Sequence, residues 1–181
     1  ALSPTPPPPH TTSSSSPPQA PSYQDAVKVS APIAKRLDEV FATLLPNATD
    51  VRPADASVGF DGLDNVNADK WFRDARGKFF VSVTVTGKDS PRVTRPEDVV
   101  CRSFETCNTY PQPDGSVVLT QLSLLQNGVN GMRVVTHFRT DGSVVRADTT
   151  NTPDGGGVAD YPLTFEQLTT LATDPDFRIV K

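Results

Sequence analysis

The chain has 181 residues and a net charge of −4, and it contains 18 prolines, two cysteines and one tryptophan. It has no stretch of about 18 consecutive apolar residues, so we expect no membrane span within it. The acidic balance argues against a protein built to hold nucleic acid, because such proteins usually present a basic surface. Two cysteines are also too few for a disulfide-dense scaffold or a four-thiolate zinc site.

The first 24 residues differ in composition from the rest of the chain. They hold eight of the 18 prolines, and 17 of the 24 positions are Pro, Ser or Thr. A segment with so little apolar surface cannot offset the entropy cost of ordering itself, so residues 1–24 are predicted to be a disordered spacer. Polyproline II geometry, at about 3.1 Å per residue, would give the spacer a reach of about 70 Å. Stalks of this composition are common next to membranes, and a linker in a larger cytosolic protein is the alternative.

Residues 25–181 have the length of a single domain. A first helix is predicted over residues 30–45, where apolar residues recur at helical spacing with charged residues between them. Ser30 would cap this helix with Pro32 in its first turn, and the pattern leaves open whether residues 23–29 add an earlier turn. A second helix is predicted after Thr164, because Thr164 and Gln167 have the spacing of a capping box.

Alternating apolar and polar residues predict strands between the two helices. The clearest cover residues 79–86, 117–125, 132–139 and 143–150, with a short fifth candidate at residues 57–60. Their short connections indicate antiparallel pairing. The sequence therefore predicts an α+β domain, with an antiparallel sheet of four to five strands and an N-terminal and a C-terminal helix packed on it.

The two cysteines, Cys101 and Cys107, are separated by five residues. This spacing favours a structural disulfide that closes a short loop. A metal site is the competing interpretation, but two thiolates need two further ligands. His10 lies in the predicted spacer, and His137 has no neighbour at ligand spacing. A disulfide in turn favours an exported protein, because oxidising compartments preserve such bonds.

The C-terminal stretch PLTFEQLTTLATDPDF, residues 162–177, resembles the ending of many exported or membrane-anchored proteins of high-GC actinobacteria. The segments at residues 139–145 and 44–46 are similar to theirs as well, so the resemblance covers residues 37–177. Such proteins are mostly uncharacterised, and the motif is a capped helix with an Asp-Pro stop. The resemblance therefore implies fold and location, and no catalytic residue is carried over from it.

No pattern in the sequence identifies a catalytic residue. There is neither a Gly-x-Ser-x-Gly elbow nor a Ser-x-x-Lys motif, and the glycines at 155–157 do not precede the Lys-Ser/Thr of a phosphate-binding loop. Nucleophilic catalysis needs a base, and His137 is the only histidine outside the spacer. By alternation it shares a strand face with Arg133 and Arg139, which is read as a solvent-facing polar surface. We predict no cofactor.

Three groups of residues are candidate binding or metal sites. Weak binding candidates are the basic residues of one hairpin and the sole tryptophan: Arg133, His137, Arg139, Arg146 and Trp71. A polar outer sheet face explains the basic residues without a ligand, and Trp71 beside Phe72 also suits a core anchor. A weak calcium candidate comprises Asp61, Asp64, Asn67 and Asp69, which lack the EF-hand glycine and final glutamate. Turn-forming Asp and Asn explain this third group without an ion.

Three functions are compatible with these features. The first is an extracytoplasmic, non-enzymatic domain with a binding, sensing or regulatory role, tethered to the cell envelope through the spacer. The second is a secreted inhibitor or interaction module that presents the Cys101–Cys107 loop, and the third is an envelope hydrolase that uses carboxylates. The expected partner is a protein or an envelope ligand, not nucleic acid, and the expected state is a monomer.

Overall fold

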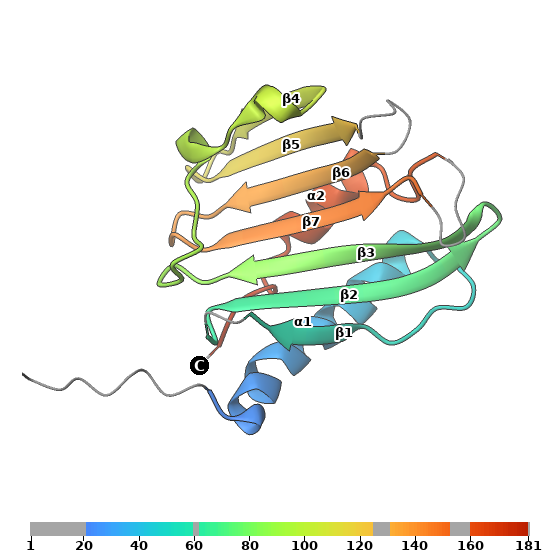
Figure 1. Cartoon of the computed structure of the whole chain (residues 1–181), viewed down its shortest axis with the longest axis horizontal. Coiled ribbons are helices and arrows are strands. Elements are labelled where there is room, and N and C mark those ends of the chain that lie inside the picture. Colours follow the sequence, from blue (N-terminus) through green and yellow to red (C-terminus); the bar gives the residue numbers. More distant parts are fainter. Residues whose placement is uncertain (1–20, 60–61, 125–130, 153–159, 181) are drawn as a thin grey trace, which may run out of the picture.

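Figure 1 shows the computed structural model, which describes residues 21–59, 62–124, 131–152 and 160–180. Within these residues one antiparallel sheet has the strand order β1-β2-β3-β7-β6-β5-β4. The strands are β1 (Asp55–Val58), β2 (Asn65–Asp74), β3 (Gly77–Thr86), β4 (Thr106–Pro111), β5 (Val117–Leu124), β6 (Gly131–Phe138) and β7 (Val144–Thr150). The helices are α1 (Tyr23–Leu44) and α2 (Phe165–Thr173). Neither described helix is long and apolar enough to cross a membrane.

The sheet has seven strands, so the predicted number of four to five is wrong, although the α+β arrangement and both terminal helices are present. The missed strands are β2 and β4. In β2 the apolar alternation of Val66, Ala68 and Phe72 is interrupted by the buried Lys70, and its Asn and Asp residues suggest a turn. In β4 nearly every side chain is exposed, so this edge strand has no apolar alternation to detect.

Helix α1 begins earlier than predicted. The Ser22 side chain caps it by accepting a hydrogen bond from the Asp25 backbone N–H (3.2 Å). Pro32 therefore lies inside the helix and not in its first turn, where it removes one backbone hydrogen bond but remains exposed. Burial of Ile33 and the neighbouring apolar face against the sheet compensates for that lost bond.

Both helices lie on one face of the sheet, behind it in Figure 1. Helix α1 packs on β1 and β2, and α2 packs on β6 and β7. The core between them is dominated by fully buried large side chains, and burying each stabilises the fold by about 1.5–3 kcal/mol. They include Ile33, Leu37, Phe41, Phe72, Phe79, Leu168 and Leu171. We call this side of the sheet the covered face.

The predicted capping box at the start of α2 is confirmed. The Gln167 side chain of this box also makes a hydrogen bond to the end of α1. Its Oε1 accepts from the Thr164 backbone N–H (2.9 Å), while its Nε2 donates to the Leu44 carbonyl at the end of α1 (3.0 Å). Arg36 of α1 also binds the Asp174 carboxylate after α2, with Nη2–Oδ2 at 2.7 Å. The two helices are thus fastened to each other as well as to the sheet.

The connection from β3 to β4, residues 87–105, crosses the sheet on the side opposite the helices, which we call the open face. It has to pass β7, β6 and β5 because β3 and β4 are not neighbours. Its Val93 and Val99 pack on a small apolar cluster of Leu119, Phe138 and Val144. Figure 1 shows this connection running along one end of the sheet. It forms a roof over part of the open face.

Candidate functional site

The sheet register separates the basic residues that the sequence predicts as one patch. Residues directly opposite each other in an antiparallel pair share a face. His137 pairs with the fully buried Val145, so His137, Arg133 and Arg139 lie on the covered face. Arg146 pairs with Thr136 and lies on the open face. The structure therefore brings three of the four residues together and places the fourth on the other side.

The two arginines on the covered face, Arg133 and Arg139, bind backbone carbonyls of the C-terminal segment. Arg133 donates from Nη1 to the Leu163 carbonyl (2.9 Å), and its guanidinium lies 4.3 Å from the Tyr161 ring centroid. Arg139 donates from Nη1 to the Phe177 carbonyl (2.7 Å) and from Nη2 to the Asp174 carbonyl (2.6 Å). These bonds satisfy backbone carbonyls beside α2 and hold both guanidinium groups against the C-terminal segment.

His137 is 8% exposed, so the expectation of a solvent-facing histidine does not hold. Its Nε2 lies 2.9 Å from Ser116 Oγ, which in turn lies 2.6 Å from Asp114 Oδ1. In a Ser-His-Asp triad the aspartate orients the histidine, whereas here Asp114 accepts from the serine backbone and hydroxyl. We interpret this cluster as a turn at the start of β5 that the Asp114–Ser116 hydrogen bonds stabilise.

Electrostatics in this cluster agree with a structural role. Burial is the largest influence and lowers the pKa of His137, with Arg139 acting in the same direction. Hydrogen bonds from Ser116 lower the pKa of Asp114. A neutral histidine beside an ionised, turn-forming carboxylate is the resulting state at neutral pH.

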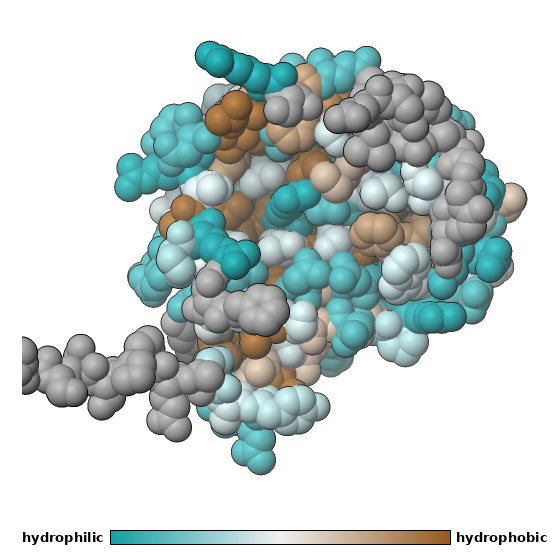
Figure 2. Space-filling model, viewed as in Figure 1, coloured by the Kyte–Doolittle hydropathy of each residue, from teal (hydrophilic) through white to brown (hydrophobic). Residues whose placement is uncertain are grey.

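The open face carries a cavity of about 450 Å³, which we call the open-face cavity. Its floor is formed by β3, β5, β6 and β7, and its roof by the β3–β4 connection. The apolar part of its lining consists of Val99, Phe104, Met132, Val134, Phe138 and Val144. Apolar and polar side chains are mixed on this face in Figure 2. The volume of this cavity lies within the range of small-molecule sites, and its lining is a mixture of apolar and polar side chains.

The polar part of the lining has an uneven charge. Hydrogen-bonding side chains are contributed by Asn65, Thr84, Thr86, Thr94, Gln121 and Thr136. Two arginines, Arg92 from the roof and Arg146 from β7, also line the cavity. Among the described residues its lining includes no Asp or Glu. The cavity is therefore locally basic within an acidic protein.

The Arg146 guanidinium forms an ion pair with Asp148. Its Nε lies 3.1 Å from Asp148 Oδ1, and Nη2 lies 3.7 Å from the Met132 sulfur. The Arg146 side chain is 43% exposed, whereas that of Asp148 is 11% exposed. Burial raises the pKa of Asp148, Arg146 opposes this, and Asp69 adds to it. The ion pair holds the guanidinium beside Asp148, and Arg146 lines the cavity.

The predicted calcium residues do not come together. Asn67 and Asp69 lie on the open face of β2 and bind each other (3.0 Å), and Asn67 Oδ1 accepts from Ser82 and Thr84. Asp64 lies before β2 and lines a different cavity of about 310 Å³. Asp61 lies outside the described residues. Within the described chain no three His, Cys, Asp or Glu side chains form a metal-binding group.

Trp71 and Phe72 separate as adjacent strand residues must. Phe72 is 1% exposed in the core, while Trp71 is 37% exposed on the open face of β2. Trp71 packs on Phe80, with ring centroids 5.2 Å apart, and Lys78 Nζ lies 4.7 Å from its ring centroid. The sole tryptophan thus lies on the same face as the cavity, on β2, near the end of the strand order opposite to β5.

Cys101 and Cys107 form a disulfide in the structure. Cys101 begins a short 3-10 turn, η2 (Cys101–Ser103), and Cys107 lies in β4. The bond ties the end of the roof to the edge strand, and Phe104 of the cavity lies within the closed loop. The disulfide therefore limits how far this part of the roof can move away from the sheet.

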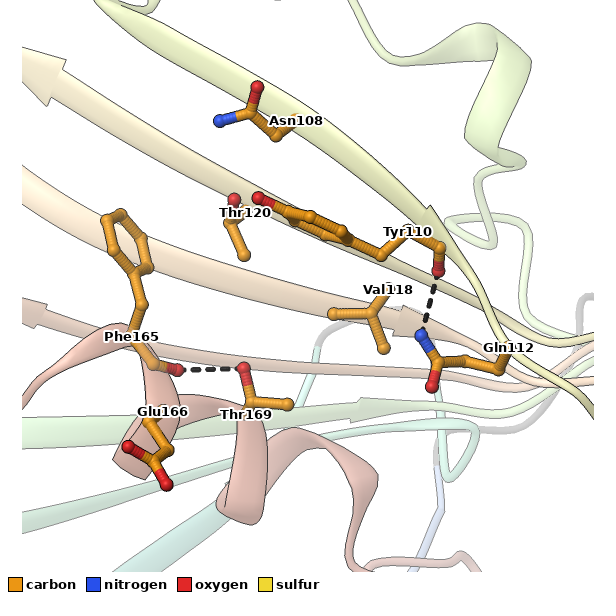
Figure 3. A pocket seen from close by; sticks show the side chains of 8 residues that line it. All are labelled: Asn108, Tyr110, Gln112, Val118, Thr120, Phe165, Glu166 and Thr169. Atoms are coloured by element: carbon orange, nitrogen blue, oxygen red, sulfur yellow. Dashed lines mark hydrogen bonds between the residues drawn. The ribbon is translucent and has the colours of Figure 1, made fainter.

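A second hollow of about 410 Å³, the sheet-edge groove, lies on the covered face. It arises because α2 covers β6 and β7 but leaves β4 and β5 bare. Figure 3 shows the rings of Tyr110 and Phe165 on opposite sides of this groove, with Thr120 between them and Val118 beside Tyr110. Tyr110 is 49% exposed. The groove is open and lies beside the free edge of β4.

Comparisons with protein-family models, with curated proteins and with solved structures find no match. The cavity therefore has to be interpreted from its own chemistry. Sequence reasoning missed Arg92, Phe104 and Gln121, which come from the roof and from β5. The apolar Val99 and Phe104 flanking Cys101 are the one sequence signal that this connection packs on something.

Proposed function

We propose that this protein is an extracytoplasmic, non-enzymatic binding domain, tethered to the cell envelope by residues 1–24, which holds a small ligand in the open-face cavity. The observation that carries the proposal is the cavity itself. It combines about 450 Å³ of space with a partly apolar floor and a roof that a disulfide ties to the edge strand. The Cys101–Cys107 bond is weakly consistent with an oxidising location.

Binding of the neutral fluorescent dye N-phenyl-1-naphthylamine tests this proposal. We expect saturable fluorescence enhancement with the full chain. Thr136→Phe places a large ring on the cavity floor and should abolish the enhancement, because Thr136 lines the cavity. Ser57→Phe is the matched control, since Ser57 is exposed on the open face of β1, outside the cavity. Absence of saturable binding, or equal loss in both variants, would contradict the proposal.

A protein-interaction module is the second candidate, and the β4 edge favours it. This strand has six residues and no charged side chain, so it lacks the charges that natural proteins use to blunt free edges. Gln112 N–H bonds to the Ser116 carbonyl, and by strand alternation the N–H groups of Cys107 and Thr109 then point outward. A photo-crosslinker at position 109 on intact cells should trap one partner, whereas one at position 57 should not.

A further inference from the structure

We infer that the ligand of the open-face cavity is an amphipathic anion, with its charged head at Arg146 and its apolar body on the floor of the cavity. This inference rests on the proposed function, because it names the ligand class for the same cavity. Two features carry it: the sign of the charge along the lining, and the way in which Arg146 is held.

The charge of the lining selects against cations. Arg92 and Arg146 both line the cavity, and no carboxylate does so among the described residues. Asp148 lies beside Arg146, but its side chain is only 11% exposed. A ligand therefore meets the Arg146 guanidinium and no carboxylate of the described lining. Partly desolvated arginine binds carboxylate or phosphate oxygens through charge-assisted hydrogen bonds, which are about twice as strong as neutral ones.

Arg146 is prepared for such a contact. Nε lies 3.1 Å from Asp148 Oδ1 in an ion pair but makes no hydrogen bond to the described residues, and the Met132 sulfur is a weak acceptor for Nη2. An incoming oxygen is a better acceptor than sulfur, so it can displace this contact at little cost. Because Asp148 already holds the guanidinium in place, binding loses less side-chain entropy than it would with a free arginine.

The apolar side chains of the floor favour a ligand whose remaining part is apolar. Phe138 and Val144 are paired across β6 and β7, Met132 and Val134 lie beyond Thr136 on the same face of β6, and Phe104 lines the cavity from the roof. An inorganic anion would leave this surface without a partner, and a neutral hydrocarbon would leave the arginine donors without one. An anion with an apolar chain satisfies both parts of the lining.

Displacement of N-phenyl-1-naphthylamine by three twelve-carbon compounds tests the inference at pH 8. Dodecanoate and dodecanol share a chain and differ in the head, and dodecyltrimethylammonium carries the opposite charge. We expect dodecanoate to displace the dye at about tenfold lower concentration than dodecanol, which corresponds to one charge-assisted contact. Dodecyltrimethylammonium should be the weakest. Dodecyl phosphate, compared with dodecanoate, then distinguishes a phosphate head from a carboxylate head.

Variants connect this preference to Arg146. Arg146→Gln should reduce the tenfold preference for dodecanoate to twofold or less while the dye still binds. The double variant Arg146→Gln/Asp148→Asn keeps a neutral pair and should behave in the same way if the single variant unfolds. Arg73→Gln is the matched control, because Arg73 lies on the open face of β2, with 52% of its side chain exposed, outside the cavity. It should retain the full preference.

The outcomes separate the two proposals. If the dye does not bind the unmodified chain, the proposed function fails. If the dye binds but dodecanoate and dodecanol displace it equally, only the anion inference is overturned. A preference for dodecyltrimethylammonium, or a dodecanoate preference that survives in the double variant, overturns it as well.

Discussion

Arginines on the two faces of the sheet make different contacts, although they belong to one hairpin in the sequence. On the covered face Arg139 gives both terminal nitrogens to backbone carbonyls beside α2. On the open face Arg146 pairs with one carboxylate and remains 43% exposed. The face, and not the residue type, decides whether a guanidinium holds the fold together or remains able to meet a ligand. The predictions below test that division, from the largest expected effect to the smallest.

Replacing Arg139 should cost the most. Arg139→Met removes two charge-assisted hydrogen bonds and leaves the Phe177 and Asp174 carbonyls without these donors. We expect the free energy of unfolding in urea to fall by about 3 kcal/mol. The control Arg73→Met removes an exposed open-face arginine and should cost less than about 0.5 kcal/mol. Equal costs for the two variants would contradict the division between the faces.

Removing the disulfide should have the next largest effect. Cys101 and Cys107 are six positions apart, and closing so short a loop stabilises the fold by about 2 kcal/mol. Cys101→Ser/Cys107→Ser should therefore unfold at lower urea concentration, and reductant should shift the unmodified protein to match it. Thiol titration of the folded protein without reductant provides an independent check. Two reactive thiols would show that no disulfide joins the roof to β4.

A pH titration should show a smaller effect that belongs to the covered face. Burial and Arg139 lower the pKa of folded His137 below 6.5, its value in the unfolded chain. Above pH 6.5 both states are neutral and His137 contributes no pH dependence. As the pH falls below 6.5 the unfolded chain gains a proton that the folded chain does not, so the free energy of unfolding decreases. This loss levels off once the pH is below the folded pKa.

His137→Gln should remove that loss between pH 7 and 5, and His10→Gln should retain it. The difference between the two variants cancels the carboxylates, which both variants share. Urea unfolding at each pH is the measurement. If both variants lose stability equally on acidification, His137 is not the buried neutral group described here.

Deleting the predicted spacer should have the smallest effect, because its composition leaves little apolar surface to bury. The predicted boundary at residue 24 falls inside α1, whose cap is Ser22, so the deletion should end at residue 20. We expect the melting temperature to change by less than about 1 °C. Extending the deletion through residue 24 removes the cap and should cost about 1 kcal/mol. A large shift from the shorter deletion would mean that the spacer contacts the domain.

Strands with one buried face were predictable, because burial imposes alternation on the sequence. Strands β3, β5, β6 and β7 and the capping box of α2 follow the expected patterns. Strand β4 was not predictable because its free edge imposes no such pattern, and β2 was hidden by the buried Lys70. That lysine binds Asp38 of α1 and donates to the Arg52 carbonyl (2.8 Å), a partnership that no local pattern records.

The candidate site was harder to predict than the fold. Alternation correctly groups Arg133, His137 and Arg139 on one face of β6, but it does not say which face the helices cover. Both faces of β6 carry apolar residues, since Val135 faces the core and Val134 and Phe138 face the cavity. The roof residues could be assigned only once the crossing of the β3–β4 connection was known, and that depends on the strand order.

Gln167, in the first turn of α2, links the folding of the two helices. Gln167 closes the start of its own helix and, through its amide nitrogen, the end of α1, which lies 123 positions earlier in sequence. The Leu44 carbonyl therefore has no partner from α2 until the C-terminal part of the domain has been synthesised. Contacts of such separation slow folding. Removing α2 should therefore leave the end of α1 without this amide partner, although α1 keeps its packing on β1 and β2.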